Sequence, residues 1–231
     1  MAERFQLTAA AVAAIDPPPH GLIVASPANP TGTFIAPAEL AAIAAVCRER
    51  GIRIVPDEIY HGLSYGEPAD TVLRQALELI VINSFSKYSS IAGWRRGWLV
   101  APEDLVEEAR NPMGNPFLTP PSLSQHAGLP AFDCADELDG HVETYRRNRA
   151  LLPDTLPALG LGEITPPDGA FYIYALIAHL TDDSLAFCTR MLNETGVATA
   201  PGIDFDPARD NRSSGSASRF PQHSSRKRPN G

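Results

Sequence analysis

The chain has 231 residues, and its composition excludes several classes of protein before any motif is considered. Hydrophobic residues make up 44% and charged residues 20%, a balance typical of a soluble globular protein with a buried core. The formal net charge of −8 argues against nucleic acid as the main partner. No apolar run approaches the ~20 residues that a membrane span needs, so no membrane association is expected.

The first half of the chain predicts alternating strands and helices. Residues 1–19 suit a short amphipathic helix closed by prolines, with a cleaved signal peptide as the alternative. Residues 37–50 have the start and stop signals of a helix. Short apolar runs bounded by turn residues predict strands over 21–27, 52–57, 78–85 and 96–102. This alternation indicates an α/β fold with a mixed, mostly parallel sheet covered by helices.

Beyond residue 102 the pattern is mainly helical, and it ends in a small α/β unit. Helices are expected over 103–110, 122–132, 134–159 and 182–196, and strands over 169–178 and 197–202, the last as strand or turn. Pro153 should end or kink the long helix. The expected organisation is a partial large domain over 1–133, a connecting helix over 134–157, a partial small domain over 158–210 and a tail over 211–231.

The tail, residues 211–231, is rich in serine and arginine and contains no acidic residue. It has no hydrophobic period, so we expect it to be disordered and basic. The composition breaks abruptly at Arg212. A shift of reading frame is the favoured explanation, because a single-base shift can turn the codons of 213–218 into those of an alternating apolar strand. A genuine disordered arm is the alternative.

Polar side chains that could take part in catalysis or ligand binding lie next to the four predicted strands of the first half. In chain order they are Asn29, Asp57, Tyr60, Ser84, Ser86, Lys87 and Arg95. Ligands of open α/β sheets bind at the carboxyl ends of the strands, and the first three segments lie at such ends. We therefore expect these side chains to converge on one crevice. The six histidines and three cysteines show no ligand spacing, so no metal site is predicted.

These residue types suit a pyridoxal cofactor. A lysine amine can form a Schiff base with an aldehyde, and a carboxylate beside the pyridine nitrogen keeps that nitrogen protonated. A phenol and an amide can hydrogen-bond the ring oxygen. Serine and arginine suit a phosphate dianion, arginine through a bidentate fork.

The ordered motifs NPTG, DEIY, SFSK and GWRRG resemble the signature of class I/II aminotransferases of fold type I. The resemblance extends through PPSLSQHAGL and PDGAFY and covers residues from about 5 to 212. It implies pyridoxal 5'-phosphate as cofactor, with Lys87 as Schiff-base lysine and proton shuttle. The remaining roles that it implies are the pyridine nitrogen for Asp57, the ring oxygen for Asn29 and Tyr60, and the phosphate for Ser84, Arg95 and, more weakly, Ser86. His61 and Tyr65 are expected to be structural or peripheral to the site.

The resemblance also implies an activity, namely transfer of an amino group between an amino acid and a 2-oxo acid. Family members carry an N-terminal section with a phosphate-binding turn and a C-terminal arginine for the substrate carboxylate. Neither is recognised here, and Arg212 and Arg219 are not assigned the arginine's role, so we expect this fragment to be impaired or inactive. A cytoplasmic location and a homodimer are implied. The alternatives are a carbon–sulfur β-lyase, another fold-type I relative, or a non-catalytic aminotransferase-like remnant.

Overall fold

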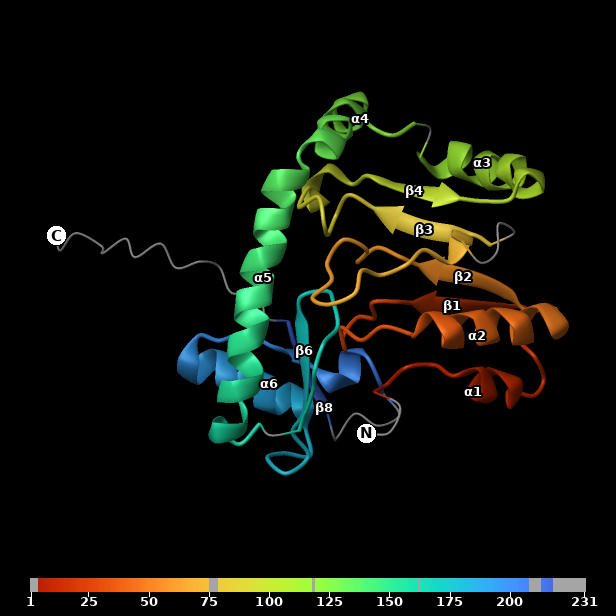
Figure 1. The fold of residues 1–231 in the computed structure, drawn as a ribbon. Coiled ribbons are helices and arrows are strands. Elements are labelled where there is room, and N and C mark those ends of the chain that lie inside the picture. The colour runs from red at the N-terminus through yellow and green to blue at the C-terminus, as the bar shows by residue number, and fades with distance from the viewer. Residues whose placement is uncertain (1–3, 75–78, 118, 162, 208–212, 218–231) are drawn as a thin grey trace.

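The computed structural model describes residues 4–74, 79–117, 119–161, 163–207 and 213–217. These residues form two four-stranded sheets with a long helix beside them (Figure 1). The first sheet has the order β1-β2-β3-β4, formed by Gly21–Ala25, Arg53–Asp57, Val81–Ser84 and Gly97–Val100. β1, β2 and β3 are parallel, and β4 is antiparallel to β3. The prediction of a mixed, mostly parallel sheet is therefore confirmed.

Two helices cover one face of this sheet and form the main core with it. They are α1 (Ala9–Ala13) and α2 (Pro37–Glu49). Alternate residues of β1, β2 and β3 face them, and Val24, Ile54 and Val81 are buried in one cluster with Leu40 and Ile43 of α2. The apolar residues at every second strand position thus pack against the apolar face of α2 in one layer.

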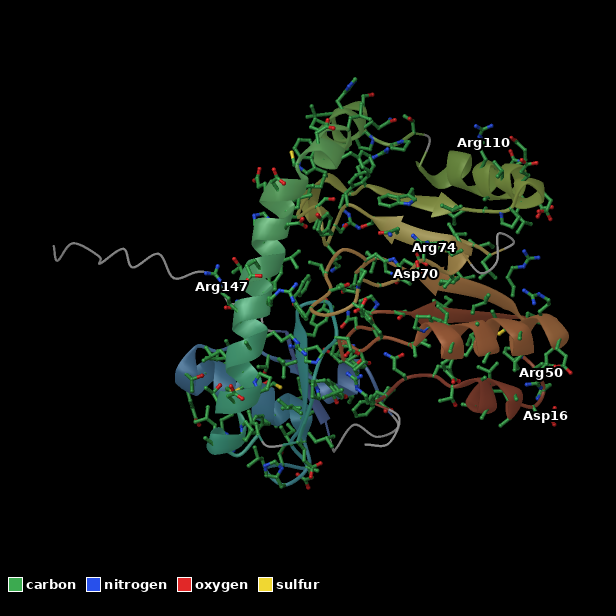
Figure 2. All side chains as sticks on the ribbon, in the orientation of Figure 1. Asp16, Arg50, Asp70, Arg74, Arg110 and Arg147 are labelled. Carbon is green, nitrogen blue, oxygen red and sulfur yellow. The ribbon has the colours of Figure 1, made fainter. Side chains whose placement is uncertain are left out.

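Local capping explains where α1 begins and how it stays in place. The side chain of Thr8 accepts a hydrogen bond from the backbone N–H of Ala11 at 3.1 Å, which satisfies one free donor of the first turn. Arg50, just beyond α2, donates to the carbonyl oxygens of Val12 and Ile15, both at 2.6 Å. Figure 2 shows Arg50 lying beside Asp16, where α1 has ended. The expected short N-terminal helix is present.

The opposite face of the first sheet is only partly covered by the described residues. Ile23 in β1 is 75% exposed, and Ile82 and Leu99 are each 38% exposed. Ile23 and Ile82 alternate with buried residues along β1 and β3, whereas all four residues of β4 are exposed. Over β1 to β3 the sheet therefore has one packed face and one apolar, accessible face.

A run of helices follows β4 and leads to the second sheet. They are α3 (Glu103–Phe117), α4 (Ser122–Gly128) and α5 (Ala135–Thr155). The structure keeps Pro153 inside α5, so the helix ends two residues after the proline and not at it. Pro153 has no N–H to donate to the carbonyl oxygen of Arg149, and the helix ends within two residues of it. Short 3-10 helices occur at Val72–Arg74, Ala92–Trp94, Pro130–Asp133, Pro157–Leu159 and Gly202–Asp204.

The second sheet has the order β5-β6-β8-β7 and is antiparallel throughout. Its strands are Ile164–Thr165, Tyr172–Leu176, Ala200–Pro201 for β7 and Ser213–Ala217 for β8, and α6 (Ser184–Thr195) lies between β6 and β7 in the chain. β8 differs from the disordered tail expected from residue 211. Main-chain hydrogen bonds to β6 explain the difference, because pairing between backbones does not depend on which side chains the strand carries. The other residues of that tail lie outside the described ranges, and the domain boundaries stay a prediction.

None of the helices described is long and apolar enough to cross a lipid bilayer. On the surface, Asp70 and Arg74 form an ion pair at 3.1 Å, and both are labelled in Figure 2. The pair is exposed, so it adds little to stability.

Candidate active site

The four segments that carry the predicted site residues meet at one edge of the first sheet. In the strand ladder, Ala25 lies opposite Asp57, and Asp57 lies opposite Ile82. β4 runs the other way, so its first residue, Gly97, lies opposite Ser84 at the end of β3. The ends of β1, β2 and β3 and the start of β4 are therefore neighbours.

Lys87 follows the end of β3 by three residues, and its amine lies over two aromatic rings. Its Nζ is 5.3 Å from the centroid of the Tyr60 ring and 5.7 Å from that of the Phe171 ring. Such positions attract a cation to the negative ring faces. Asp57 ends β2 three residues before Tyr60, and its Oδ1 accepts a hydrogen bond from the N–H of Ile59 at 3.0 Å. The Lys87 amine therefore lies beside the Tyr60 phenol, and Asp57 ends the strand that leads to Tyr60.

The Tyr60 hydroxyl is buried and paired. The residue is 3% exposed, and its hydroxyl oxygen lies 2.5 Å from that of Tyr172. Burial is the main cause that raises the pKa of Tyr60 well above its ordinary value. Tyr60 therefore keeps its proton at neutral pH and is available as a hydrogen-bond donor.

Ser84 and Ser86 form a tight turn after β3. The N–H of Ser86 donates to Ser84 Oγ at 2.9 Å, while the N–H of Ser84 donates to the side-chain oxygen of Asn83 at 2.7 Å. The turn leaves the hydroxyl of Ser84 with its own hydrogen still to donate. It occupies the sheet edge next to the Lys87 segment.

Asn29 and Arg95 share the edge through their backbones, while their side chains are exposed. Arg95 has a left-handed backbone, with φ of 53°, and its guanidinium donates to the carbonyl of Ala92 at 3.2 Å. Asn29 lies in a turn closed by the bond from Gly32 N to Ala28 O at 2.7 Å. The structure therefore brings the segments of both residues to the edge and leaves both residues exposed.

Phe171 and Tyr172 belong to the site, and the sequence analysis did not select them. Their segment is fixed to the Asn29 turn, because the N–H groups of Asp168 and Gly169 both donate to Gly32 O, at 2.8 and 2.9 Å. The only signal in the sequence was the PDGAFY motif, which marks the segment without indicating its place in space.

His61 supports the loops of the site. Its Nε2 lies 3.1 Å from the carbonyl oxygen of Ser26, and its Nδ1 lies 3.4 Å from Glu58, so it ties the loop after β2 to the end of β1. Tyr65 bonds the carbonyl of Ala170 through its hydroxyl. Both contacts fit the structural roles expected for these residues. In the part of the chain that is described, no three histidine, cysteine or acidic side chains form a metal-binding group.

Comparison with known proteins agrees with this geometry. The family model "Aminotransferase class I and II" matches residues 1–212. The valine–pyruvate aminotransferase of Mycobacterium tuberculosis is 50% identical over 210 residues, which cover 89% of this chain and 54% of that protein. A probable N-acetyl-LL-diaminopimelate aminotransferase of Bacillus subtilis is 35% identical, covering 87% of this chain and 52% of its own length.

Solved structures give the same result for the fold. A crystal structure of an aminotransferase from Mycobacterium tuberculosis has a TM-score of 0.89 and 48% identity, over 94% of this chain and 57% of that one. The aspartate aminotransferase of Thermus thermophilus, as a double mutant, has a TM-score of 0.85 and 32% identity, with the same coverage of 94% and 57%. The chain spans about half the length of the curated relatives it matches. The match over residues 1–212, together with these solved structures, shows that this chain belongs to the class I and II aminotransferases of fold type I.

Proposed function

We propose that this chain carries the cofactor-binding side of a pyridoxal-phosphate-dependent aminotransferase. Such an enzyme moves an amino group between an amino acid and a 2-oxo acid. One observation carries the proposal: the Lys87 amine lies 5.3 Å from the ring centroid of the buried Tyr60, beside the strand end that holds Asp57. An amine, a carboxylate and a protonated phenol at one sheet edge are the groups that a pyridoxal ring requires.

The donor set suits this cofactor in residue type, and the segments that carry it meet at one edge of the first sheet. Lys87 would hold its aldehyde carbon, Asp57 its pyridine nitrogen, and Tyr60 with Asn29 its ring oxygen. Ser84, Arg95 and Ser86 are the candidates for its phosphate. Arg95 would need to turn from Ala92, which its guanidinium contacts at 3.2 Å. An exposed arginine can change rotamer at small cost, so this contact is compatible with the role.

When bound, pyridoxal phosphate supplies an electron sink that stabilises a carbanion at the substrate α-carbon. The protein residues supply the rest. Asp57 keeps a proton on the ring nitrogen through its negative charge. Tyr60 would donate a hydrogen bond to the ring oxygen and keep its proton. The Lys87 amine moves the proton to and from the reacting carbon as general acid and base.

The substrates proposed are an amino acid and a 2-oxo acid. The relative at 50% identity is named a valine–pyruvate aminotransferase, so valine and pyruvate are the first pair to test. A homodimer is proposed from the family resemblance. A cytoplasmic location is proposed because Cys47, Cys134 and Cys188 are free thiols, which suit a reducing compartment. No feature of the site favours the carbon–sulfur lyase alternative, and the relatives compared above are named as aminotransferases.

The test is to map where the cofactor attaches. The protein is mixed with pyridoxal phosphate, reduced with borohydride and digested, and the label is located by mass spectrometry. We expect the label on Lys87. Lys227, the only other lysine in the chain, provides the matched control. Lys227→Arg should keep the label and Lys87→Arg should lose it. A label found mainly on Lys227, or none on either lysine, would refute the proposed site.

A further inference from the structure

The Tyr60 hydroxyl contacts a second tyrosine hydroxyl, that of Tyr172. The oxygens of Tyr60 and Tyr172 are 2.5 Å apart, and either can be the donor. The two rings meet edge to face, with centroids 5.6 Å apart and an interplanar angle of 74°. The residues lie 112 positions apart in sequence. The contact therefore joins the loop after β2 of the first sheet to β6 of the second.

Aromatic packing and a backbone hydrogen bond fix the positions of the two hydroxyls. The Phe171 ring contacts both partners, with centroids 5.8 Å from Tyr60 and 4.8 Å from Tyr172. The backbone adds a second constraint, because the N–H of Ala170 donates to the carbonyl of Leu63 at 2.9 Å. Removing the hydroxyl of Tyr172 would leave this aromatic packing in place. The hydroxyl contact can thus be tested separately from the fold.

Hydrogen-bond valence determines what this pair can do. A phenol has one hydrogen to donate and can also accept. Burial raises the pKa of Tyr172 as well as that of Tyr60, so both hydroxyls keep their protons. If Tyr172 donates, Tyr60 accepts, and the single hydrogen of Tyr60 is left pointing to another acceptor. Consecutive hydrogen bonds of this kind polarise and strengthen one another.

We propose that Tyr172 is a positioning residue for Tyr60: it donates to the Tyr60 oxygen and so directs the Tyr60 hydrogen to the ring oxygen of the cofactor. Tyr172 itself does not touch the cofactor in this arrangement. The inference rests on the proposed function, since it needs a pyridoxal ring above Lys87. The link between the two hydroxyls is independent of that function, because both are present in the protein alone.

The experiment is a double-mutant cycle with Tyr60→Phe, Tyr172→Phe and the double variant. Tyr88→Phe is the matched control, because it removes a tyrosine hydroxyl that bonds Asp139, at 2.7 Å, instead of Tyr60. The first measurement uses protein without cofactor and follows the urea midpoint of unfolding. We expect the sum of the stability losses in the two single variants to exceed the loss in the double variant, because each single substitution deletes the same hydrogen bond. Additive losses would show that the hydroxyls are not bonded and would overturn the inference.

The second measurement is the dissociation constant for pyridoxal phosphate, by equilibrium dialysis, with the visible spectrum of the bound cofactor. A neutral hydrogen bond corresponds to roughly a 2- to 10-fold change in affinity. We expect this weakening of affinity for Tyr172→Phe, with the visible band of the bound cofactor displaced in the same direction as in Tyr60→Phe. The double variant should bind the cofactor as weakly as Tyr60→Phe alone and no more weakly. Tyr88→Phe should leave both readouts unchanged.

The outcomes distinguish the two proposals. If Tyr172→Phe weakens binding equally with and without the Tyr60 hydroxyl, Tyr172 acts independently and the positioning role is refuted. If only the unfolding midpoints move, the pair is structural and the positioning role is again refuted. Failure of the unmodified protein to bind the cofactor would refute the proposed function, and with it a role for Tyr172 toward that cofactor.

Discussion

The turn at Gly32 gives a sharp test of how the site is assembled. Gly32 has φ of +67°, and a Cβ added there would lie 2.6 Å from the Cβ of Pro167 and 2.7 Å from the carbonyl oxygen of Gly169. For Gly32→Ala, the left-handed backbone costs about 1–2 kcal/mol. Relieving the two contacts costs about 1–3 kcal/mol, as in other overpacked sites. We therefore expect the free energy of unfolding to fall by about 2–5 kcal/mol.

Urea denaturation followed by circular dichroism measures this loss, and two glycines provide matched controls. Gly51 also has φ of +67° but has no atom within 4 Å of an added Cβ, so Gly51→Ala isolates the backbone cost. Gly66 has open space and no left-handed φ, so Gly66→Ala should change stability little. If Gly32→Ala costs no more than Gly51→Ala, the packing of this turn against residues 166–169 is not as described. The Gly32 turn would then not be what holds residues 166–169 beside the Asn29 segment.

Three further predictions concern other parts of the chain. Asp57→Asn should weaken pyridoxal phosphate binding about 10- to 100-fold, as loss of a charge-assisted hydrogen bond does, and unchanged affinity in dialysis would argue against its role. Asp183→Ala should lower the free energy of unfolding by about 1 kcal/mol, because Asp183 caps α6. Its Oδ1 accepts a hydrogen bond from the N–H of Ala186 at 2.9 Å. A urea midpoint equal to that of the unmodified protein would contradict this prediction. Burial and then the hydrogen bond to Asp139 raise the pKa of Tyr88 to about 12 from 10.0. The stabilisation from this raised pKa is present below pH 10 and is lost as the pH rises to about 12, so the stability gap between the unmodified protein and Tyr88→Phe should narrow over that range; a gap that is constant with pH would count against the bond.

The meeting of the polar segments could be predicted from sequence because it depends on local pattern. Asp57 and Ser84 each follow an apolar run, and parallel strands bring such ends to one edge. The strand ends shifted by a few residues, as in Val81–Ser84 for the expected 78–85. The site roles themselves remain proposals, as does the reading-frame explanation of the tail, although the family match also ends at residue 212.

What could not be predicted depends on contacts between distant parts of the chain. Tyr172 reaches Tyr60 across 112 residues, and no local spacing encodes that meeting. The exposed positions of Asn29 and Arg95 are also set by turns, not by strand pattern. The strand at residues 213–217 was missed because its serine and glycine content is typical of a coil, while an open edge of β6 selects for backbone hydrogen bonds alone.

The central position of β8 determines how the second sheet should open. Among the strands described, β7 pairs with β8 and with no other, so β7 is joined to β6 only through Ser213–Ala217. Strands of serine, glycine and alanine have low β-propensity. Loss of β8 would therefore release β7, while the first sheet keeps its own core. Amide hydrogen exchange should accordingly be faster in β7 and β8 than in β1 and β2, as for a cooperative unit that opens well below the global free energy of unfolding.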